Sequence, residues 1–170
     1  FAGLRYSHIL PRWGGMTHRL VLGVDDKLFE NEGVPVGGGA DLLTDVRSRP
    51  ASLAYGLSYE GGGWSGQLTM TYVRNVMSGG GNTGAAYRAN RQGAKPQWDA
   101  LKVSGRWTGS PLYGWTPRLL FDGQLSSEEL IPGEQFGLGG ARSVRGYDER
   151  EVSGDDGYRV SVEGWSPVYA

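Results

Sequence analysis

The chain has 170 residues, including 30 glycines, 6 tryptophans and 9 tyrosines, and its formal net charge at pH 7 is −1. This composition is too rich in glycine and aromatic residues for a helical protein, and it favours short strands joined by turns. The near-neutral charge gives no reason to expect a nucleic-acid partner, and the absence of cysteine excludes disulfides and thiolate metal sites. No apolar run approaches the roughly 18 residues that a membrane-spanning helix needs.

Segments in which apolar and polar residues alternate follow one another along the chain, and the pattern predicts no helix between them. We predict seven strands, over residues 1–10, 17–29, 50–60, 64–76, 98–108, 115–126 and 157–166. The fourth segment is the clearest, because its apolar row runs from Trp64 to Tyr72 while its other row consists of serine, glutamine and threonine. Each predicted strand therefore has one apolar row and one polar row.

Two features indicate which row faces inward. A soluble sandwich buries its apolar rows, whereas a membrane barrel turns them to lipid. Trp64 and Tyr72 end one apolar row about 19 Å apart along the membrane normal, as two interfacial girdles require. The polar rows carry charges in mid-strand, which a wet lumen tolerates and a protein core does not. These charges belong to Lys102, Arg106, Arg118, Asp122, Arg159 and Glu163.

The predicted connections alternate in length. Short turns lie at 11–16, 61–63 and 109–114, and long connections lie at 31–49, 77–97 and 126–157. Short periplasmic turns and long extracellular loops are typical of outer-membrane barrels, so the long connections are expected on the extracellular side. Seven strands would leave open edges with unpaired backbone groups in lipid, and we therefore expect this sheet to be part of a larger barrel.

A glycine-punctuated segment follows the sixth predicted strand. It begins Phe136-Gly-Leu-Gly-Gly140, continues to Val144-Arg-Gly-Tyr147, and is followed by Asp148 and Glu149. The glycines permit a tight reversal of the backbone. This segment resembles the long sixth extracellular loop of the two-partner secretion transporters of the ShlB/FhaC/HecB family, which are distant relatives of the BamA and TamA insertases.

The resemblance implies a fold and a function. It implies an all-β chain in which residues 1–170 form part of a C-terminal transmembrane β-barrel of about sixteen strands, with the loop 127–156 folding into the pore. The POTRA domains and the last strands would lie outside this sequence. The implied activity is ATP-independent export of a large exoprotein across the bacterial outer membrane. The implied partners are that exoprotein and outer-membrane lipid, with no nucleotide, no metal and no cofactor; no P-loop pattern occurs.

The same resemblance assigns roles to individual residues. The loop tip inside the lumen would be Val144, Arg145, Gly146 and Tyr147, and the loop would be shaped by Phe136, Gly137, Gly139 and Gly140. An arginine in a narrow lumen needs a carboxylate partner, for which Asp122 and Glu163 are candidates. Arg145 would either anchor the loop for barrel assembly or take part in gating.

Three other interpretations stay open. A BamA-like or TamA-like assembly factor would share the Arg-Gly core of the loop, although Tyr147 and the Phe136–Gly140 run favour the secretion branch. A plain porin would explain the strands and not the loop. A soluble β-sandwich glycosidase would need paired mid-strand carboxylates on a concave face. The acidic turns at 126–129 and 153–156 are expected to be solvated, and His8 and His18 lack a metal-binding pattern, so we predict no catalytic site.

Overall fold

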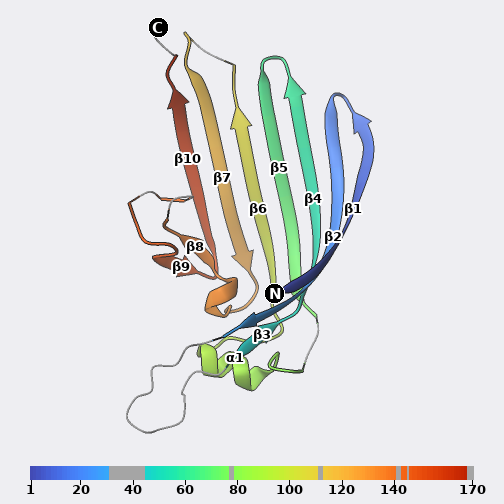
Figure 1. The fold of residues 1–170 in the computed structure, drawn as a ribbon, viewed down its shortest axis with the longest axis vertical. Coiled ribbons are helices and arrows are strands. Elements are labelled where there is room, and N and C mark those ends of the chain that lie inside the picture. Colours follow the sequence, from blue (N-terminus) through green and yellow to red (C-terminus); the bar gives the residue numbers. More distant parts are fainter. Residues whose placement is uncertain (31–44, 77–78, 111–112, 141–142, 145, 168–170) are drawn as a thin grey trace.

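The fold is one large twisted antiparallel sheet with smaller elements and loops gathered at one end (Figure 1). The computed structural model describes residues 1–30, 45–76, 79–110, 113–140, 143–144 and 146–167. Within these residues the sheet has eight strands in the order β1-β2-β4-β5-β6-β7-β10, with β3 paired to β2. The strands are β1 (Ala2–Trp13), β2 (Met16–Phe29), β3 (Val46–Ser48), β4 (Pro50–Gly61), β5 (Trp64–Asn75), β6 (Asp99–Thr108), β7 (Thr116–Ser126) and β10 (Gly157–Trp165). The seven long strands agree with the predicted ones to within three residues at each end, and the predicted all-β fold class is confirmed.

The register aligns like residues across the sheet. One apolar row runs Leu22, Leu53, Tyr72, Leu101 and Leu125 from β2 to β7. Since neighbouring residues of a strand point to opposite faces, positions an odd number of residues away lie on the other face, where one row is polar. That row runs Arg19, Gly56, Thr69, Ser104, Asp122 and Arg159 from β2 to β10. The sheet therefore has one apolar face and one largely polar face from β2 to β10.

The apolar face is covered by nothing within the described chain. Large side chains on it stay exposed, among them Leu53 (47%), Met70 (41%) and Val162 (79%). Tryptophans gather on this face at the end with the short turns: Trp13, Trp64, Trp107 and Trp115. The ring of Trp64 stacks on that of Tyr59 with their centroids 4.1 Å apart. An apolar band edged by aromatic residues is the surface that a membrane β-barrel presents to lipid.

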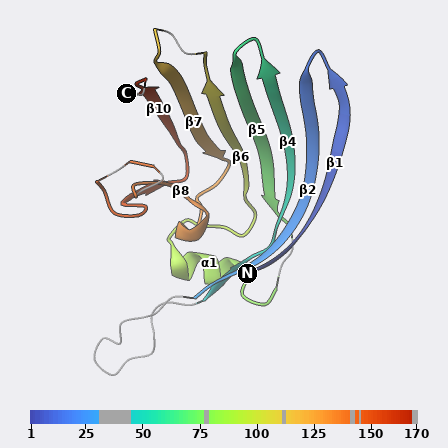
Figure 2. The same ribbon diagram turned by 45° about the horizontal axis from the view of Figure 1, so that its top comes forward.

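Within the described residues, a compact core of buried side chains lies at the opposite end of the sheet, around α1, β3 and the residues that follow β7 (Figures 1 and 2 show these elements). We call this region the cap. Its buried apolar residues are Val46, Val73, Ala86, Tyr87, Ala94, Trp98, Ala100, Leu130 and Ile131. Asn75 fastens the cap to β5, because its side-chain amide donates to Asn82 Oδ1 (2.8 Å), Tyr87 Oη (3.1 Å) and the carbonyl of Pro96 (2.7 Å). These bonds satisfy polar groups that would otherwise be costly to bury.

The structure corrects the prediction that no helix is present. Helix α1 (Gly84–Asn90) lies in the connection between β5 and β6, and the Thr83 hydroxyl caps it by accepting from the N–H of Ala86 (3.3 Å). Seven residues make too few turns for helical periodicity to be visible in the sequence, but Thr83 was a usable start signal. Three more short elements were not predicted: β3, the 3-10 helix η1 (Pro132–Glu134), and the two-stranded sheet of β8 (Phe136–Leu138) and β9 (Val152–Gly154). Among the described residues, no helix has the length and apolar character needed to cross a membrane.

Candidate functional site

The candidate site is the segment 127–156, which connects β7 to β10 and turns back beside β10 (Figures 1 and 2). Its first part is held in the cap, because Leu130 and Ile131 are fully buried there. Burying two such side chains contributes about 1.5–3 kcal/mol each. The segment therefore begins from a fixed point, which we call the loop root (residues 130–135).

A buried ion pair ties the loop root to a distant strand. Both carboxylate oxygens of Glu134 accept from Lys27 Nζ at 2.9 Å, and Glu134 is only 3% exposed. Lys27 belongs to β2, and three strands separate β2 from β7 in the sheet. A flat sheet would place β2 and β7 about 19 Å apart. The loop root must therefore reach across the polar face from the end of β7 to Lys27 on β2. Breaking such a pair would leave a buried charge without a partner.

At the other end of the segment, the Asp155 carboxylate accepts three hydrogen bonds that join this end to the cap and to the loop root. The donors are Arg91 Nη1 (2.6 Å), the N–H of Leu130 (2.9 Å) and Gln135 Nε2 (3.2 Å). Partial burial would raise the pKa of Asp155, but these hydrogen bonds outweigh it and hold the pKa below its ordinary value. Gln124 of β7 completes the join by donating to the carbonyls of Glu134 (3.2 Å) and Asp155 (3.0 Å). The expectation that the 153–156 acids are solvated is therefore wrong for Asp155.

The loop-shaping residues form a short hairpin. Phe136, Gly137 and Leu138 pair with Gly154, Ser153 and Val152. The Phe136 ring lies against the backbone of Gly157, where an added Cβ would stand 2.5 Å from it, and it lines the same hollow as Thr71 and Lys102 of the polar face. The loop therefore rests on the polar face.

The backbone beyond β8 requires glycine. Gly139 and Gly140 have φ of +117° and +87°, and a Cβ on Gly139 would stand 2.1 Å from the carbonyl oxygen of Asp148. Gly140 N–H donates to the carbonyl of Tyr147 (3.1 Å), which closes the loop behind its tip. Arg150 braces the base of the loop by donating to the carbonyls of Pro132 (2.7 Å) and Gln135 (2.9 Å).

The predicted tip is described in part. Gly146 has φ of +91°, and the side chains of Val144 and Tyr147 are exposed by 39% and 58%. Arg145, the central residue of the prediction, lies outside the described residues.

Both predicted acidic partners lie on the polar face and carry ion pairs. Asp122 pairs with Arg159 across β7 and β10, and Glu163 accepts from Arg118 Nη1 at 3.4 Å. Each pair also follows the register, since Asp122 is opposite Arg159 and Glu163 is opposite Arg118. Cross-strand pairs of opposite charge stabilise the join between two strands.

Sequence reasoning missed the residues that hold the loop, namely Lys27, Arg91, Glu134, Arg150 and Asp155. The partners of the two ion pairs are 107 and 64 residues apart in sequence, so no local spacing reveals them. The only local signal was an acid directly after Leu-Ile-Pro-Gly, where an apolar pair already indicated burial.

A sheet with one lipid-type face, one polar face and a loop anchored on the polar face defines a segment of β-barrel wall. The sequence of the chain places it in one family of such barrels. Residues 41–163 match the family model described as haemolysin secretion/activation protein ShlB/FhaC/HecB, and the chain belongs to this family. The predicted family is therefore confirmed.

The fold has a counterpart among solved structures. CdiB from Escherichia coli superposes with a TM-score of 0.76 at 23% sequence identity, over 95% of this chain and 29% of that chain. At this identity the likeness concerns the fold, and this chain spans less than a third of that protein's length. Comparison with curated proteins gives no match.

Proposed function

We propose that the chain is part of an outer-membrane pore that exports a partner exoprotein in two-partner secretion, without ATP and without catalysing a reaction. One observation carries the proposal: the family model of secretion proteins matches a chain whose sheet has a polar row across β2, β4, β5, β6, β7 and β10, with the loop root fixed on the same face. A polar wall opposite a lipid-type face is what a water-filled passage requires.

The polar wall suits an unfolded polypeptide. An extended chain exposes backbone N–H and C=O groups that must stay hydrogen-bonded during passage. Hydroxyl and amide side chains in the middle of the wall, such as Thr69, Ser104 and Gln67, exchange hydrogen bonds with it without fixing one sequence. No step of this process uses a nucleophile or a bound nucleotide, and folding of the exported protein outside the cell supplies direction.

The loop tip is proposed to act in secretion, with Val144, Arg145, Gly146 and Tyr147 as its residues. Support comes from the fixed loop root and from the glycine-dependent backbone at Gly139, Gly140 and Gly146. Asp122 and Glu163 stay candidate partners of Arg145, and either would then share its carboxylate with the arginine that already pairs with it.

The test uses the complete parent protein in its native membrane. Arg145→Ala is compared with Arg88→Ala, which removes an exposed arginine from α1. Release of the exoprotein into the medium and heat-modifiable gel mobility are measured together. We expect Arg145→Ala to assemble a folded barrel and to lose most release, with Arg88→Ala unaffected. Unchanged release would remove the proposed role of the tip, and a missing barrel would make Arg145 an assembly anchor instead.

A further inference from the structure

The polar face carries more positive than negative charge. On the seven long strands, the polar-face positions that the structure describes hold eight basic and four acidic side chains, an excess of four positive charges in a chain whose formal charge is −1. The basic residues are Arg5, Arg12, Arg19, Lys27, Lys102, Arg106, Arg118 and Arg159, and the acidic ones are Asp25, Glu60, Asp122 and Glu163.

Three of the four acidic side chains already form ion pairs with basic side chains of the polar face. Asp25 pairs with Arg5 (2.7 Å), Asp122 with Arg159 and Glu163 with Arg118. Lys27 is neutralised from outside the sheet by Glu134. Among the described residues, four basic side chains of the polar face form no ion pair: the exposed Arg12, Arg19 and Arg106, and the half-buried Lys102. The uncompensated charge is therefore concentrated on arginines in the half of the wall nearer the short turns.

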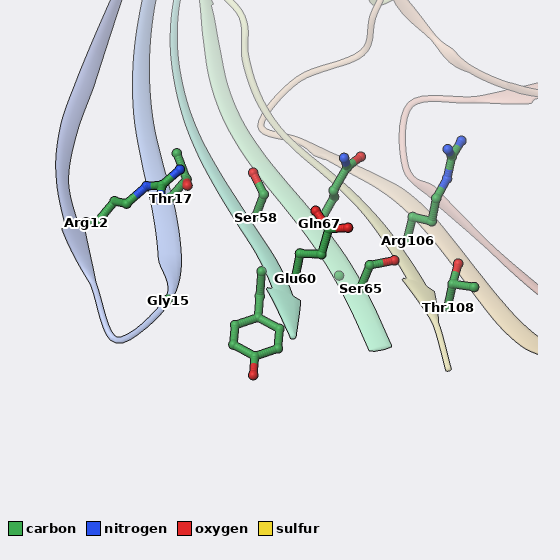
Figure 3. A pocket seen from close by; sticks show the side chains of 11 residues that line it. Arg12, Gly15, Thr17, Ser58, Glu60, Ser65, Gln67, Arg106 and Thr108 are labelled. Carbon is green, nitrogen blue, oxygen red and sulfur yellow. The ribbon is translucent and has the colours of Figure 1, made fainter. Parts of the chain in front are cut away.

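Two of these arginines stand at opposite sides of one hollow (Figure 3). The hollow has a volume of about 540 Å³ and crosses β1, β2, β4, β5 and β6 at the short-turn end of the polar face. Arg12 lines it on β1 and Arg106 on β6, and between them lie Thr17, Ser58, Gln67 and Glu60. We call this the arginine vestibule. Its lining combines two guanidinium groups with hydroxyl and amide donors, and only one carboxylate opposes them.

From this arrangement we infer that the arginine vestibule binds a carboxylate-rich, extended polypeptide segment. An arginine stays charged at any relevant pH and offers five donors that fit a carboxylate in bidentate geometry. The hydroxyl and amide side chains between the arginines pair with peptide groups, as the backbone of an extended segment requires. The inference rests on the proposed function. It adds that the segment of the exoprotein that enters the passage at the short-turn end is acidic.

The favoured charge follows from Coulomb's law. A segment bearing several Asp or Glu side chains meets an excess of positive charge on the wall, whereas a basic segment meets repulsion that Glu60 offsets only in part. Because the vestibule is open to water, each exposed contact is weak and sensitive to salt. Selection of acidic segments therefore depends on several contacts acting together.

The experiment measures binding with the purified full-length protein in detergent micelles. Fluorescence anisotropy follows a labelled polyglutamate peptide, with polylysine of equal length as the opposite charge. The test variant is Arg12→Gln combined with Arg106→Gln, and the control is Arg88→Gln, which removes one arginine charge from the exposed face of α1. A separate variant, Glu60→Gln, removes the opposing carboxylate.

We expect the double variant to bind polyglutamate about five- to tenfold more weakly than the unmodified protein, and Arg88→Gln to bind it equally well. Glu60→Gln should bind it more tightly, and about 0.5 M salt should abolish the difference. Equal affinity of the double variant and the unmodified protein, or tighter binding of polylysine, would overturn the inference. Circular dichroism and heat-modifiable mobility verify that each variant is folded.

Export of the exoprotein is measured in parallel, so that the two ideas fail separately. If the unmodified protein releases no exoprotein from cells yet binds polyglutamate through these arginines, the proposed function fails and the vestibule stands. If release is normal and the double variant binds polyglutamate unchanged, the vestibule fails and the proposed function stands.

Discussion

The wall and the cap of this molecule are stabilised in different ways. In the wall, by which we mean the seven long strands, neighbouring strands are joined by backbone hydrogen bonds. Large apolar side chains such as Leu68 and Val160 stay exposed on the apolar face, which no other element of the described chain covers. In the cap, Tyr87, Trp98, Leu130 and Ile131 are buried as in a soluble domain. The apolar side chains of such a wall are expected to contact lipid, whereas those of the cap pack against other side chains of the protein.

The contrast explains why the loop is attached where it is. Within the described residues, the cap provides the dry core in which Leu130 and Ile131 are buried, and the polar face provides Lys27 as the partner of Glu134. The loop root uses both regions. Its position therefore depends on the cap core and on one ion pair across the wall, and each dependence is open to a separate test.

The largest expected effect compares two tryptophans near the two ends of β6. Trp98→Ala removes a side chain that is 1% exposed in the cap and should destabilise the cap by about 3–5 kcal/mol. Trp107→Ala removes a side chain that is 40% exposed on the apolar face and should have a smaller effect. Limited proteolysis of the intact protein in membranes measures cleavage in the long connections. Equal protection of the two variants would contradict the distinction between cap and wall.

A smaller effect is expected from the ion pair of the loop root. Glu134→Gln leaves Lys27 without its carboxylate partner in a largely buried site and should cost about 1–3 kcal/mol of loop attachment. The matched control is Glu128→Gln, because Glu128 pairs with Lys95 at 2.7 Å where both side chains are more exposed, and such pairs are worth about 0–1 kcal/mol. Hydrogen exchange of residues 130–138 reads out the attachment. Equal exchange in both variants would show that the ion pair with Lys27 does not hold the loop root.

The smallest effect is a dependence on pH. The pKa of Asp155 in the folded protein lies below its ordinary value, so its contribution to stability is complete above the unfolded pKa of about 3.9 and is lost as pH falls through the folded pKa. Exchange at residues 153–156 should therefore accelerate below about pH 4, after correction for the intrinsic rate. Asp155→Asn should show raised exchange at neutral pH and lose this acid step. An unchanged acid step in Asp155→Asn would assign it to another group.

The strands were predictable and the loop attachment was not. Alternation is a local property with a period of two, so strands such as Trp64–Asn75 are visible in the sequence. Helix α1 and strand β3 are too short to show a period, and they form because the cap core holds them. The glycines of the loop were found because positive φ requires glycine at Gly139 and Gly140. Glu134 and Asp155 were missed because their partners come from β2 and from the end of α1, which meet only after the sheet has formed.

The proposed passage depends most on which face of the sheet meets water. These 170 residues contain no cysteine, so one placed among them gives a single labelling site within this part of the protein. Thr69→Cys and Met70→Cys are neighbours on the central strand β5, with Thr69 on the polar face and Met70 on the apolar face. In the assembled protein in its membrane, a small water-soluble maleimide should label Thr69→Cys and leave Met70→Cys unlabelled until the membrane is dissolved and the protein denatured. Labelling of Met70→Cys in place of Thr69→Cys would contradict the assignment of the polar face to a water-filled passage.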